Sequence, residues 1–498
     1  MDVDMAEADC PDVFVQKSNS FLSWLQGTGA TVSSKIQLED LRQQHRGRGV
    51  LAKQDIAEDE ELFAVPRAAV LNTETSTLPH ELKTHFDDPW LSLITVMIYE
   101  YQRGTESKWK PYFDVLPETF TTLMFWKPDE LKYLAGSAVV NKIGKESADE
   151  AFMDKIVPII KQHSHVFKSD GVNDAELLRL CHRMGSTIMA YAFDLEKPES
   201  DQPKPGDEEW EDDEEETEIL PKGMVPMADM LNADADRNNA KLYYEEDKVV
   251  MKSIKPIKAG EELFNDYGPL PNADVLRRYG YTTENYSKYD VVDIDLATIK
   301  RRSEVQHKEM LKYDIEDRLQ YLEEQGVLDD GYDVAHGGSE EFEQFPEELC
   351  IVLNTLCAAN EDFDKWKRKD KLPKPELTGE ALRLFYDVLA ERRADYGFAE
   401  VDPKDISTPK QMDAWRVLAG EKSLLHEAAE TVQQLRSQQG GSAEGSSSGF
   451  EQLAQSIKTA REQTNGAPVP SGSDNKRKNE GDDQEQKHEG TGKRTKTG

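Results

Sequence analysis

The stretch Glu261-Glu262-Leu263-Phe264-Asn265-Asp266-Tyr267-Gly268 is the part of this sequence that most strongly indicates its fold. An apolar pair follows a polar turn and leads into Asn-Asp, a tyrosine and a turn glycine, a pattern typical of a short strand that ends in a turn. A similar pattern occurs earlier, because Asp55-Ile-Ala-Glu-Asp-Glu-Glu-Leu-Phe63 parallels Pro256-Ile-Lys-Ala-Gly-Glu-Glu-Leu-Phe264. Two copies are too few for a repeat array, so we expect matching hairpins in a β-rich core.

A helical block separates two β-rich parts of the chain. Apolar runs predict strands at 47–52 and 61–66, and Leu242–Ser253 predicts a strand–turn–strand unit. Between them, residues 75–195 carry apolar residues at the three- and four-residue spacing of helices. The helical segments in this block are Leu91–Tyr101, Asp149–Gln162 and Ala175–Phe193. Composition and periodicity together indicate an α+β fold.

Strand patterns stop at about residue 291, and helical patterns follow. Leu382, Phe385, Tyr386 and Leu389 lie on one face of such a helix, as a packed bundle requires. The predicted helices are Val305–Gln325, Pro346–Ala358, Glu380–Tyr396 and Lys410–Leu435. From Gly440 onward the sequence is rich in Gly and Ser and then in Lys, which predicts a disordered tail.

Two charged segments have open interpretations. Asp207–Glu218 is nearly all acidic and is expected to be a disordered loop, either a plain solvated insertion or an element that recruits a basic substrate. Lys476-Arg477-Lys478 and Lys493-Arg494-Thr495-Lys496 have the spacing of a bipartite nuclear import signal, the alternative being an ordinary charged tail. We expect a nuclear location, with the cytoplasm as a second compartment.

The composition restricts the partners. The 61 Lys and Arg residues against 97 Asp and Glu give a net charge of −36, which argues against direct nucleic-acid binding, since a duplex binder needs a positive face. The acidic excess favours a basic protein partner, or serves only as a solubilising surface. The four cysteines form no C-x-C or C-x-x-C pair, and no metal site is expected. The acidic N-terminus and the short apolar runs predict neither a signal peptide nor a membrane span.

Four motifs occur in a characteristic order: Gly47-Arg48-Gly49, Met227–Asn232, Phe264–Gly268 and Tyr279-Gly280-Tyr281. Together they resemble the SET-domain protein lysine methyltransferases. The sequence is most similar to the Rubisco-methyltransferase-like branch, in particular the group of SET-domain-containing protein 6 and the fungal ribosomal-lysine methyltransferases. The resemblance implies a β-rich SET domain over 16–290, with a helical insert over about 75–195 and an acidic loop over about 196–218. It further implies an all-α substrate-binding domain over 291–437 and a disordered tail over 438–498.

The resemblance implies methyl transfer from S-adenosylmethionine to a protein lysine. A free lysine has a pKa of about 10.4, so an apolar channel beside the positive sulfonium must favour the neutral amine. Alignment of the reactants can then supply about 7–11 kcal/mol. By resemblance Tyr267 is the catalytic residue, whose hydroxyl positions the amine and the methyl group and does not act as an anionic base. Without the other motifs, Tyr267 would be a common strand-end tyrosine.

The resemblance also assigns binding residues. Those expected at the cofactor are Lys35, Gly47, Gly49, Tyr191, Asn232, Ala233 and Tyr279; those expected at the substrate are Trp90, Phe193 and Tyr281. Two positions depart from the family pattern: Ala233 stands where a histidine is usual, and Tyr191 where the wider branch has arginine. Core packing is the alternative role for Tyr191 and for Trp90.

Three functions are consistent with these residues. The first is a lysine methyltransferase acting on a large-subunit ribosomal protein or another basic nuclear protein. The second is a protein-histidine methyltransferase with the same motifs. The third is a non-catalytic acidic adaptor that retains the SET fold, with Ala233 as its lesion. The target residue, the number of methyl groups and the oligomeric state are not encoded in these motifs.

Overall fold

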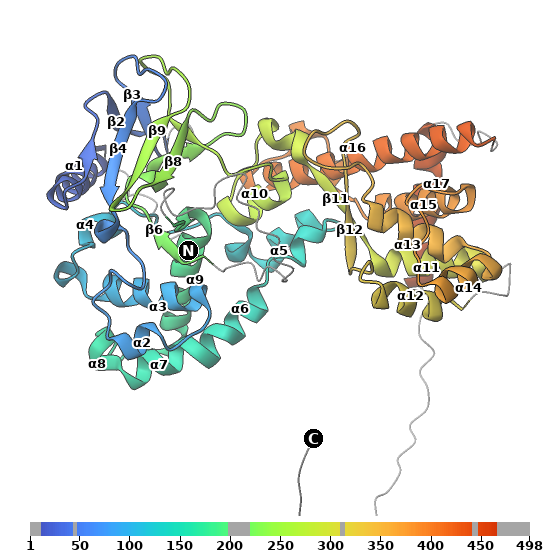
Figure 1. Cartoon of the computed structure of the whole chain (residues 1–498), viewed down its shortest axis with the longest axis horizontal. Coiled ribbons are helices and arrows are strands. Elements are labelled where there is room, and N and C mark those ends of the chain that lie inside the picture. Colours follow the sequence, from blue (N-terminus) through green and yellow to red (C-terminus); the bar gives the residue numbers. More distant parts are fainter. Residues whose placement is uncertain (1–10, 43–46, 198–219, 309–313, 441–446, 466–498) are drawn as a thin grey trace, which may run out of the picture.

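The computed structural model describes residues 11–42, 47–197, 220–308, 314–440 and 447–465. Two lobes lie side by side, an N-terminal lobe of strands and helices and a C-terminal lobe of packed helices (Figure 1). The acidic segment Asp207–Glu218 and both basic clusters of the tail lie outside the described residues. No helix in the described ranges has the length and apolar character needed to cross a membrane.

An antiparallel sheet of strand order β1-β4-β9-β8 forms the centre of the N-terminal lobe. Its strands are β1 (Thr31–Val32), β4 (Glu61–Pro66), β9 (Lys248–Ser253) and β8 (Ala240–Tyr244). Two-stranded sheets adjoin it: β2 (Ile36–Asp40) with β3 (Arg48–Ala52), β5 (Ala192–Asp194) with β6 (Lys222–Met224), and β7 (Asn232–Ala233) with β10 (Phe264–Asn265). The strands predicted at 47–52, 61–66 and 242–253 are confirmed.

The two similar turn segments pair with each other. Backbone hydrogen bonds link Ile56 and Ile257 in both directions, at N···O distances of 2.9 and 3.0 Å. The Lys258 ammonium also pairs with the Asp55 carboxylate at 2.8 Å. The prediction of two separate hairpins is therefore wrong, because β3 and β4 belong to different sheets. The repeated pattern instead gives two turns that satisfy each other's backbone groups.

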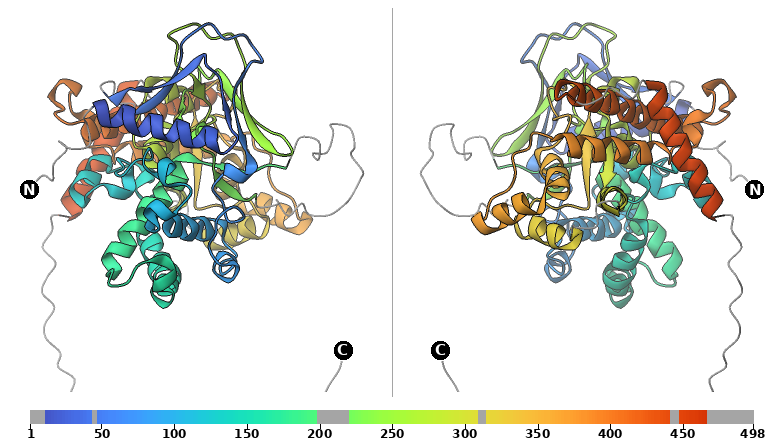
Figure 2. Two further views of the ribbon diagram at one scale, coloured as in Figure 1. Left: turned by 90° about the vertical axis from the view of Figure 1, so that its left-hand side faces the viewer. Right: turned by 90° about the vertical axis from the view of Figure 1, so that its right-hand side faces the viewer.

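The helical insert packs beneath this sheet (Figures 1 and 2). Its helices are α2 (His80–Lys83), α3 (Pro89–Gln102), α4 (Lys110–Phe113), α5 (Pro128–Leu131), α6 (Lys145–Ala151), α7 (Val157–Gln162), α8 (Ser164–Phe167) and α9 (Asp174–Tyr191). Asp88 caps α3 and Asn173 caps α9 through their side-chain oxygens. The helices predicted at Leu91–Tyr101 and Ala175–Phe193 are confirmed. Helix α1 (Pro11–Gly27) lies across the outer end of the lobe.

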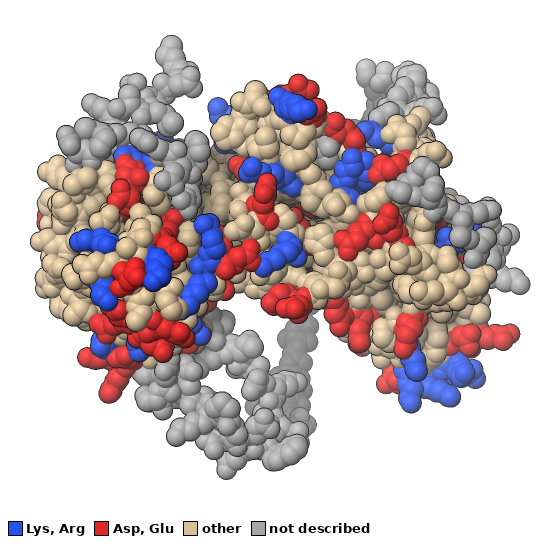
Figure 3. All heavy atoms as spheres, turned by 90° about the horizontal axis from the view of Figure 1, so that it is seen from above, with Lys and Arg blue, Asp and Glu red and all other residues tan. Residues whose placement is uncertain are grey.

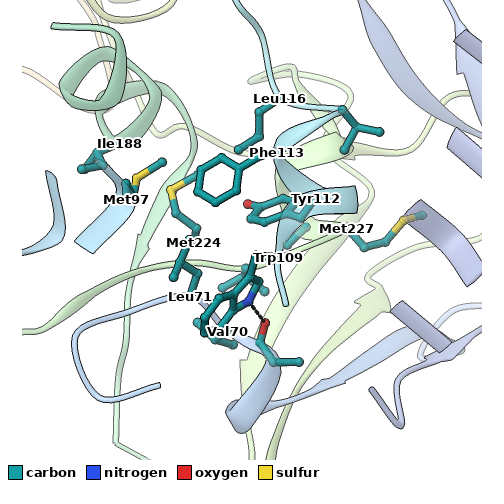
Figure 4. Packing of buried hydrophobic residues seen from close by; sticks show 14 of the residues in the cluster. Val70, Leu71, Met97, Trp109, Tyr112, Phe113, Leu116, Ile188, Met224 and Met227 are labelled. Atoms are coloured by element: carbon teal, nitrogen blue, oxygen red, sulfur yellow. Dashed lines mark hydrogen bonds between the residues drawn. The ribbon is translucent and has the colours of Figure 1, made fainter. Parts of the chain in front are cut away.

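Aromatic residues of α4 fill the core between the insert and the sheet (Figure 4). Trp109 and Tyr112 are fully buried, and Met224 of β6 packs among the same residues. The Trp109 indole nitrogen donates to the Ala69 carbonyl at 3.4 Å, which satisfies its polar atom (Figure 4). This core supports the end of α9, where Tyr191 lies, and β6, which pairs with the strand that carries Phe193.

The C-terminal lobe is mainly helical, but not entirely. Its helices are α11 (Leu296–Lys308), α12 (Ile315–Glu324), α13 (Glu347–Cys357), α14 (Asn360–Lys369), α15 (Gly379–Arg393), α16 (Pro409–Gln438) and α17 (Ser447–Asn465). Strands β11 (Val291–Asp295) and β12 (Gly331–Ala335) pair antiparallel and enter the core of this lobe. The expectation of an all-α lobe is therefore wrong at these strands, because alternating apolar residues bury one face of each.

Helix α17 corrects the predicted tail. The expectation of disorder from residue 438 fails over Ser447–Asn465, because Phe450 is 1% exposed in the core of the C-terminal lobe. Arg461 of α17 forms ion pairs with Glu391 of α15 and with Asp395, which follows that helix. An apolar anchor and buried charge pairing together fix this helix on the lobe.

A small third core joins the two lobes. It lies where the insert, α10 (Asn272–Tyr279) and α16 meet, and α10 and α16 run side by side there (Figure 1). Its buried members are Leu123, Trp126, Leu134, Val139, Leu276, Ala414 and Val417. Helix α10 carries one of the four motifs at its end, so the C-terminal lobe reaches the candidate site through this core.

Candidate active site

Three of the four motifs meet along one set of short strands. Strands β7 and β10 run parallel, with Asn232 opposite Phe264 and Ala233 opposite Asn265. On the other side, the Leu263 amide donates to the Val50 carbonyl of β3 at 2.8 Å. The backbone therefore brings the glycine motif, the asparagine motif and the tyrosine motif together, although they are distant in sequence.

The two glycines of the first motif meet different structural requirements. Gly47 has a φ of +65°, and a Cβ atom there would meet nothing within 4 Å. Gly49 has an ordinary φ, but a Cβ atom there would lie 2.5 Å from Leu41 Cδ1 and 2.9 Å from Glu262 Oε1. Gly47 thus supplies a turn conformation, and Gly49 allows close packing against the strand that leads to Tyr267.

Asn232 is held in place by its amide nitrogen. Its Nδ2 donates to Glu262 Oε1 at 2.7 Å and to the Arg48 carbonyl at 3.3 Å. Within the described ranges its amide oxygen makes no hydrogen bond to the protein. The side chain is therefore fixed in orientation, with an acceptor oxygen available to a ligand.

A group of tyrosines surrounds Tyr267. The ring of Tyr267 stacks on that of Tyr279, with centroids 4.0 Å apart and planes 4° apart. Burial raises the pKa of the Tyr267 hydroxyl well above its ordinary value of 10, and Tyr281, Tyr279 and Tyr191 add to this effect. These predicted residues therefore lie close enough to interact electrostatically, and the Tyr267 hydroxyl is neutral at physiological pH.

Tyr286 belongs to the same group but was not predicted. Its side chain is buried, and within the described residues its hydroxyl has no hydrogen-bond partner. Burial raises its pKa, with further contributions from Tyr281 and Tyr279. Tyr286 and Tyr289 both lie within one short 3-10 helix, Glu284–Tyr289, so spacing alone did not separate the buried tyrosine from its more exposed neighbour.

A buried carboxyl lies behind the tyrosine group. The Tyr112 hydroxyl donates to Asp229 Oδ2, whereas Asp229 Oδ1 has no hydrogen-bond partner in the described part of the chain. Burial raises the pKa of Asp229 to about 7, against the opposing effects of the Tyr112 hydrogen bond and the Arg48 charge. Asp229 in turn contributes to a Tyr191 pKa raised to about 12, mainly by burial. Asp229 lies within the second motif, but its residue type there predicted no role.

A strained residue precedes this carboxyl. Met227 has φ +82° and ψ −37° and is fully buried. A non-glycine residue rarely adopts this conformation, and buried packing must hold it there. The turn directs the following residues, 228–232, along the edge of the site toward β7.

The remaining predicted residues lie around this centre. Lys35, just before β2, pairs with Glu60 at 2.8 Å. Its backbone also bonds to Ser33 and Lys53, and none of these partners belongs to the four motifs. Trp90 lies in the first turn of α3, half-buried against the core, with the Lys222 ammonium 5.4 Å from its ring centre. Phe193 lies on β5 opposite Gly223 of β6 and is also half-buried. In the described ranges, no group of three or more His, Cys, Asp or Glu residues is placed to hold a metal ion.

Comparisons with known proteins agree with this arrangement. The SET domain family model matches residues 47–268. Ribosomal lysine N-methyltransferase 4 of Saccharomyces cerevisiae is 35% identical over 371 residues, which are 70% of this chain and 73% of that protein. N-lysine methyltransferase SETD6 of Bos taurus is 30% identical over 450 residues, 82% of this chain and 94% of that protein.

Solved structures show the same fold. Rubisco LSMT bound to AdoMet superposes with a TM-score of 0.62 at 19% identity, covering 91% of this chain and 97% of that one. Rubisco LSMT bound to sinefungin and monomethyllysine has a TM-score of 0.62 at 20% identity, covering 84% and 92%. The architecture expected from the motifs, a SET domain with a helical C-terminal lobe, is therefore confirmed. The chain belongs to the SET-domain protein-lysine N-methyltransferases, enzymes that use S-adenosylmethionine as methyl donor.

Proposed function

We propose that this protein methylates a lysine of a large-subunit ribosomal protein, with another basic nuclear protein as the next choice of substrate. The main evidence for this reaction is the stacking of Tyr267 on Tyr279 beside the strand that carries Asn232. Tyr267 and Asn232 both lie within the segment that matches the SET family. The ribosomal substrate is supported by the name of the yeast relative.

The residues present suit S-adenosylmethionine. When bound, this cofactor supplies an electrophilic methyl group on a positively charged sulfur. The Asn232 amide oxygen offers an acceptor for an ammonium group, and aromatic faces of the tyrosine group offer contacts that favour positive charge. Gly47 leaves open space where any other residue would place a Cβ atom. We therefore assign cofactor binding to this edge of the site.

The tyrosine group can favour the neutral form of the substrate lysine and orient its amine. Burial among these rings, beside a positively charged sulfur when the cofactor is bound, would disfavour the ammonium form of an entering lysine and favour the reactive neutral amine. The Tyr267 hydroxyl keeps its proton, since its pKa lies well above 10. It can accept a hydrogen bond from the amine and orient the nitrogen, so its contribution is alignment and not proton abstraction.

Charge supports a basic substrate. With a net charge of −36, the chain attracts positively charged proteins. Acidic and basic side chains are interspersed over the face in Figure 3, so the attraction arises from the excess over the whole chain. The basic clusters of the tail, Lys476-Arg477-Lys478 and Lys493-Arg494-Thr495-Lys496, support the nuclear location that we propose.

Ala233 motivates the second candidate, a non-catalytic adaptor. Its position on β7 retains the parallel pairing with β10, so a role carried by the backbone survives the loss of the histidine side chain. An adaptor would have no need of the stacked tyrosines or of the oriented Asn232 amide. These features favour the enzyme.

The test combines calorimetric titration with S-adenosylmethionine and labelled methyl transfer onto total ribosomal protein. We expect binding, and transfer to one basic protein that falls by at least a hundredfold in Tyr267→Phe while the cofactor Kd changes less than about threefold. Tyr243→Phe, on β8, is the matched control. Absence of cofactor binding would favour the adaptor, and label on histidine would identify the histidine methyltransferase. Normal turnover in Tyr267→Phe would remove Tyr267 from the mechanism.

A further inference from the structure

The segment that carries Tyr279 and Tyr281 is held by the C-terminal lobe. Thr282, which is buried, follows Tyr281 directly, and its hydroxyl donates to Asp413 Oδ1 at 2.7 Å. Arg416 donates to the same hydroxyl at 3.5 Å. Both partners belong to α16. The Thr282 hydroxyl, next to the proposed lysine channel, therefore makes two hydrogen bonds to the C-terminal lobe, one as donor and one as acceptor.

A second contact holds the same segment from its far end. The Asp290 carboxylate accepts from the Asn272 backbone amide at 2.7 Å, and Asn272 Oδ1 accepts from the Thr283 amide at 2.9 Å. At Gly420 of α16, a Cβ atom would lie 2.4 Å from Asp290 Oδ2. Helix α16 therefore packs directly on the network that orients α10 and the residues after it.

The insert closes the opposite side. The Thr121 hydroxyl donates to the Gly280 carbonyl at 3.0 Å. Gly280 has a φ of +80°, and a Cβ atom there would lie 2.4 Å from Thr121 Oγ1. The turn between the two tyrosines is thus enclosed by the insert on one side and by α16 on the other, above the shared core of Leu276, Ala414 and Val417.

We propose that Asp413 and Arg416 are positioning residues for methyl transfer, which act through Thr282 to fix the ring of Tyr281. The C-terminal lobe then has a second task besides any contact with substrate, because its longest helix sets the geometry of the proposed lysine channel. This inference rests on the proposed function, since it presumes that Tyr281 lines the lysine channel.

The chemistry of the contact fits a positioning role. Burial raises the pKa of Asp413, while the Thr282 hydrogen bond and the Arg416 charge oppose that effect. Removing the hydroxyl would leave a partly buried carboxylate with one donor fewer, and the side chain would move to regain one. A displacement of about 1 Å in a group that aligns reactants can cost about a hundredfold in rate.

The test compares Thr282→Val, which keeps the shape and loses the hydroxyl, with Thr282→Ser, which keeps the hydroxyl. Thr431→Val is the control, because Thr431 lies on α16, as Asp413 and Arg416 do, but its hydroxyl bonds to Glu427 and Gln344, away from the tyrosines. We expect a ten- to hundredfold loss of kcat in Thr282→Val, a cofactor Kd within about threefold, and recovery to within about threefold in Thr282→Ser. The ratio of mono-, di- and trimethylated product should also shift.

Asp413→Ala provides a second variant that should reproduce the loss if Thr282→Val does not fold. Wild-type kcat in both variants would overturn the positioning role while leaving the proposed function intact. An equal loss in Thr431→Val would also overturn it, since that loss would reflect general destabilisation. A wild-type protein that transfers no methyl group would refute the proposed function itself, and the positioning role with it.

Discussion

Gly49→Ala tests whether the proposed cofactor edge depends on the packing between β3 and β10. The new methyl group would lie 2.5 Å from Leu41 Cδ1, 2.9 Å from Glu262 Oε1 and 3.2 Å from Asn232 Nδ2. Leu41 Cδ1 is the end of a flexible side chain, which can move at a small cost in free energy. Glu262 cannot move without breaking its 2.7 Å hydrogen bond with Asn232, so the substitution acts on the residue that we assign to the cofactor.

The magnitude follows from these contacts. Overpacking of this kind costs about 1–3 kcal/mol of folding stability, and losing a hydrogen bond to a charged group costs about 1.5–3 kcal/mol. If the lost hydrogen bond leaves Asn232 without the orientation that cofactor binding requires, its cost is subtracted from the binding free energy. The cofactor Kd then rises about ten- to hundredfold. Calorimetry measures this affinity, and urea unfolding measures the stability.

Gly27→Ala is the matched control, because a Cβ atom there meets nothing within 4 Å at the end of α1. It should leave the cofactor Kd unchanged and alter stability by less than about 1 kcal/mol. A Gly49→Ala protein with reduced stability but wild-type cofactor affinity would refute the reasoning, since it would show that the Asn232 orientation does not support binding.

Three further predictions concern two buried groups and the C-terminal tail. Because the Asp229 pKa is raised to about 7 from an ordinary 3.8, the folded state holds a proton that the unfolded state releases. The unfolding free energy should therefore fall as pH rises from about 4 to 7, by a few kcal/mol from this residue. Asp229→Asn should flatten that part of the profile in urea unfolding, and an unchanged profile would assign the dependence elsewhere. Phe450→Ala should cost about 3–5 kcal/mol, since Phe450 is buried in the C-terminal core. Truncation after Asn465 should leave stability and activity intact but abolish nuclear accumulation in imaged cells, whereas truncation after Gly440 should also destabilise the lobe. Nuclear accumulation of the shorter proteins would refute the interpretation of the basic clusters as an import signal.

The N-terminal lobe could be predicted from the sequence because chemistry constrains its motifs. A positive φ at Gly47, a close approach at Gly49 and an aromatic hydroxyl at Tyr267 each restrict the residue type. The order of the motifs then identified the fold, and the structure brings them together. Tyr286 and Asp229 were missed because one is a further tyrosine in a polar turn and the other lies within an apolar run.

The errors in the C-terminal lobe have a different origin. Residues 291–295 alternate apolar and polar side chains, which is a strand pattern, but a short two-stranded pair between long helices gives a weak signal. In α17, Phe450, Leu453 and Ile457 have helical spacing, yet the Gly- and Ser-rich residues before them suggested continuous disorder. In both segments, packing against the lobe decided the structure more than local propensity did.

The contact between the lobes shows most clearly what one sequence cannot reveal. Thr282 and Asp413 are 131 residues apart, and both are residue types that are common on protein surfaces. Only the shared core beneath α10 brings them together, with Thr282 buried at the contact. The motif residues identify the reaction, whereas the residues that hold them in place are drawn from ordinary positions in another lobe. A variant in α16 can therefore alter turnover without touching any motif, and such an effect should be sought first at Asp413 and Arg416.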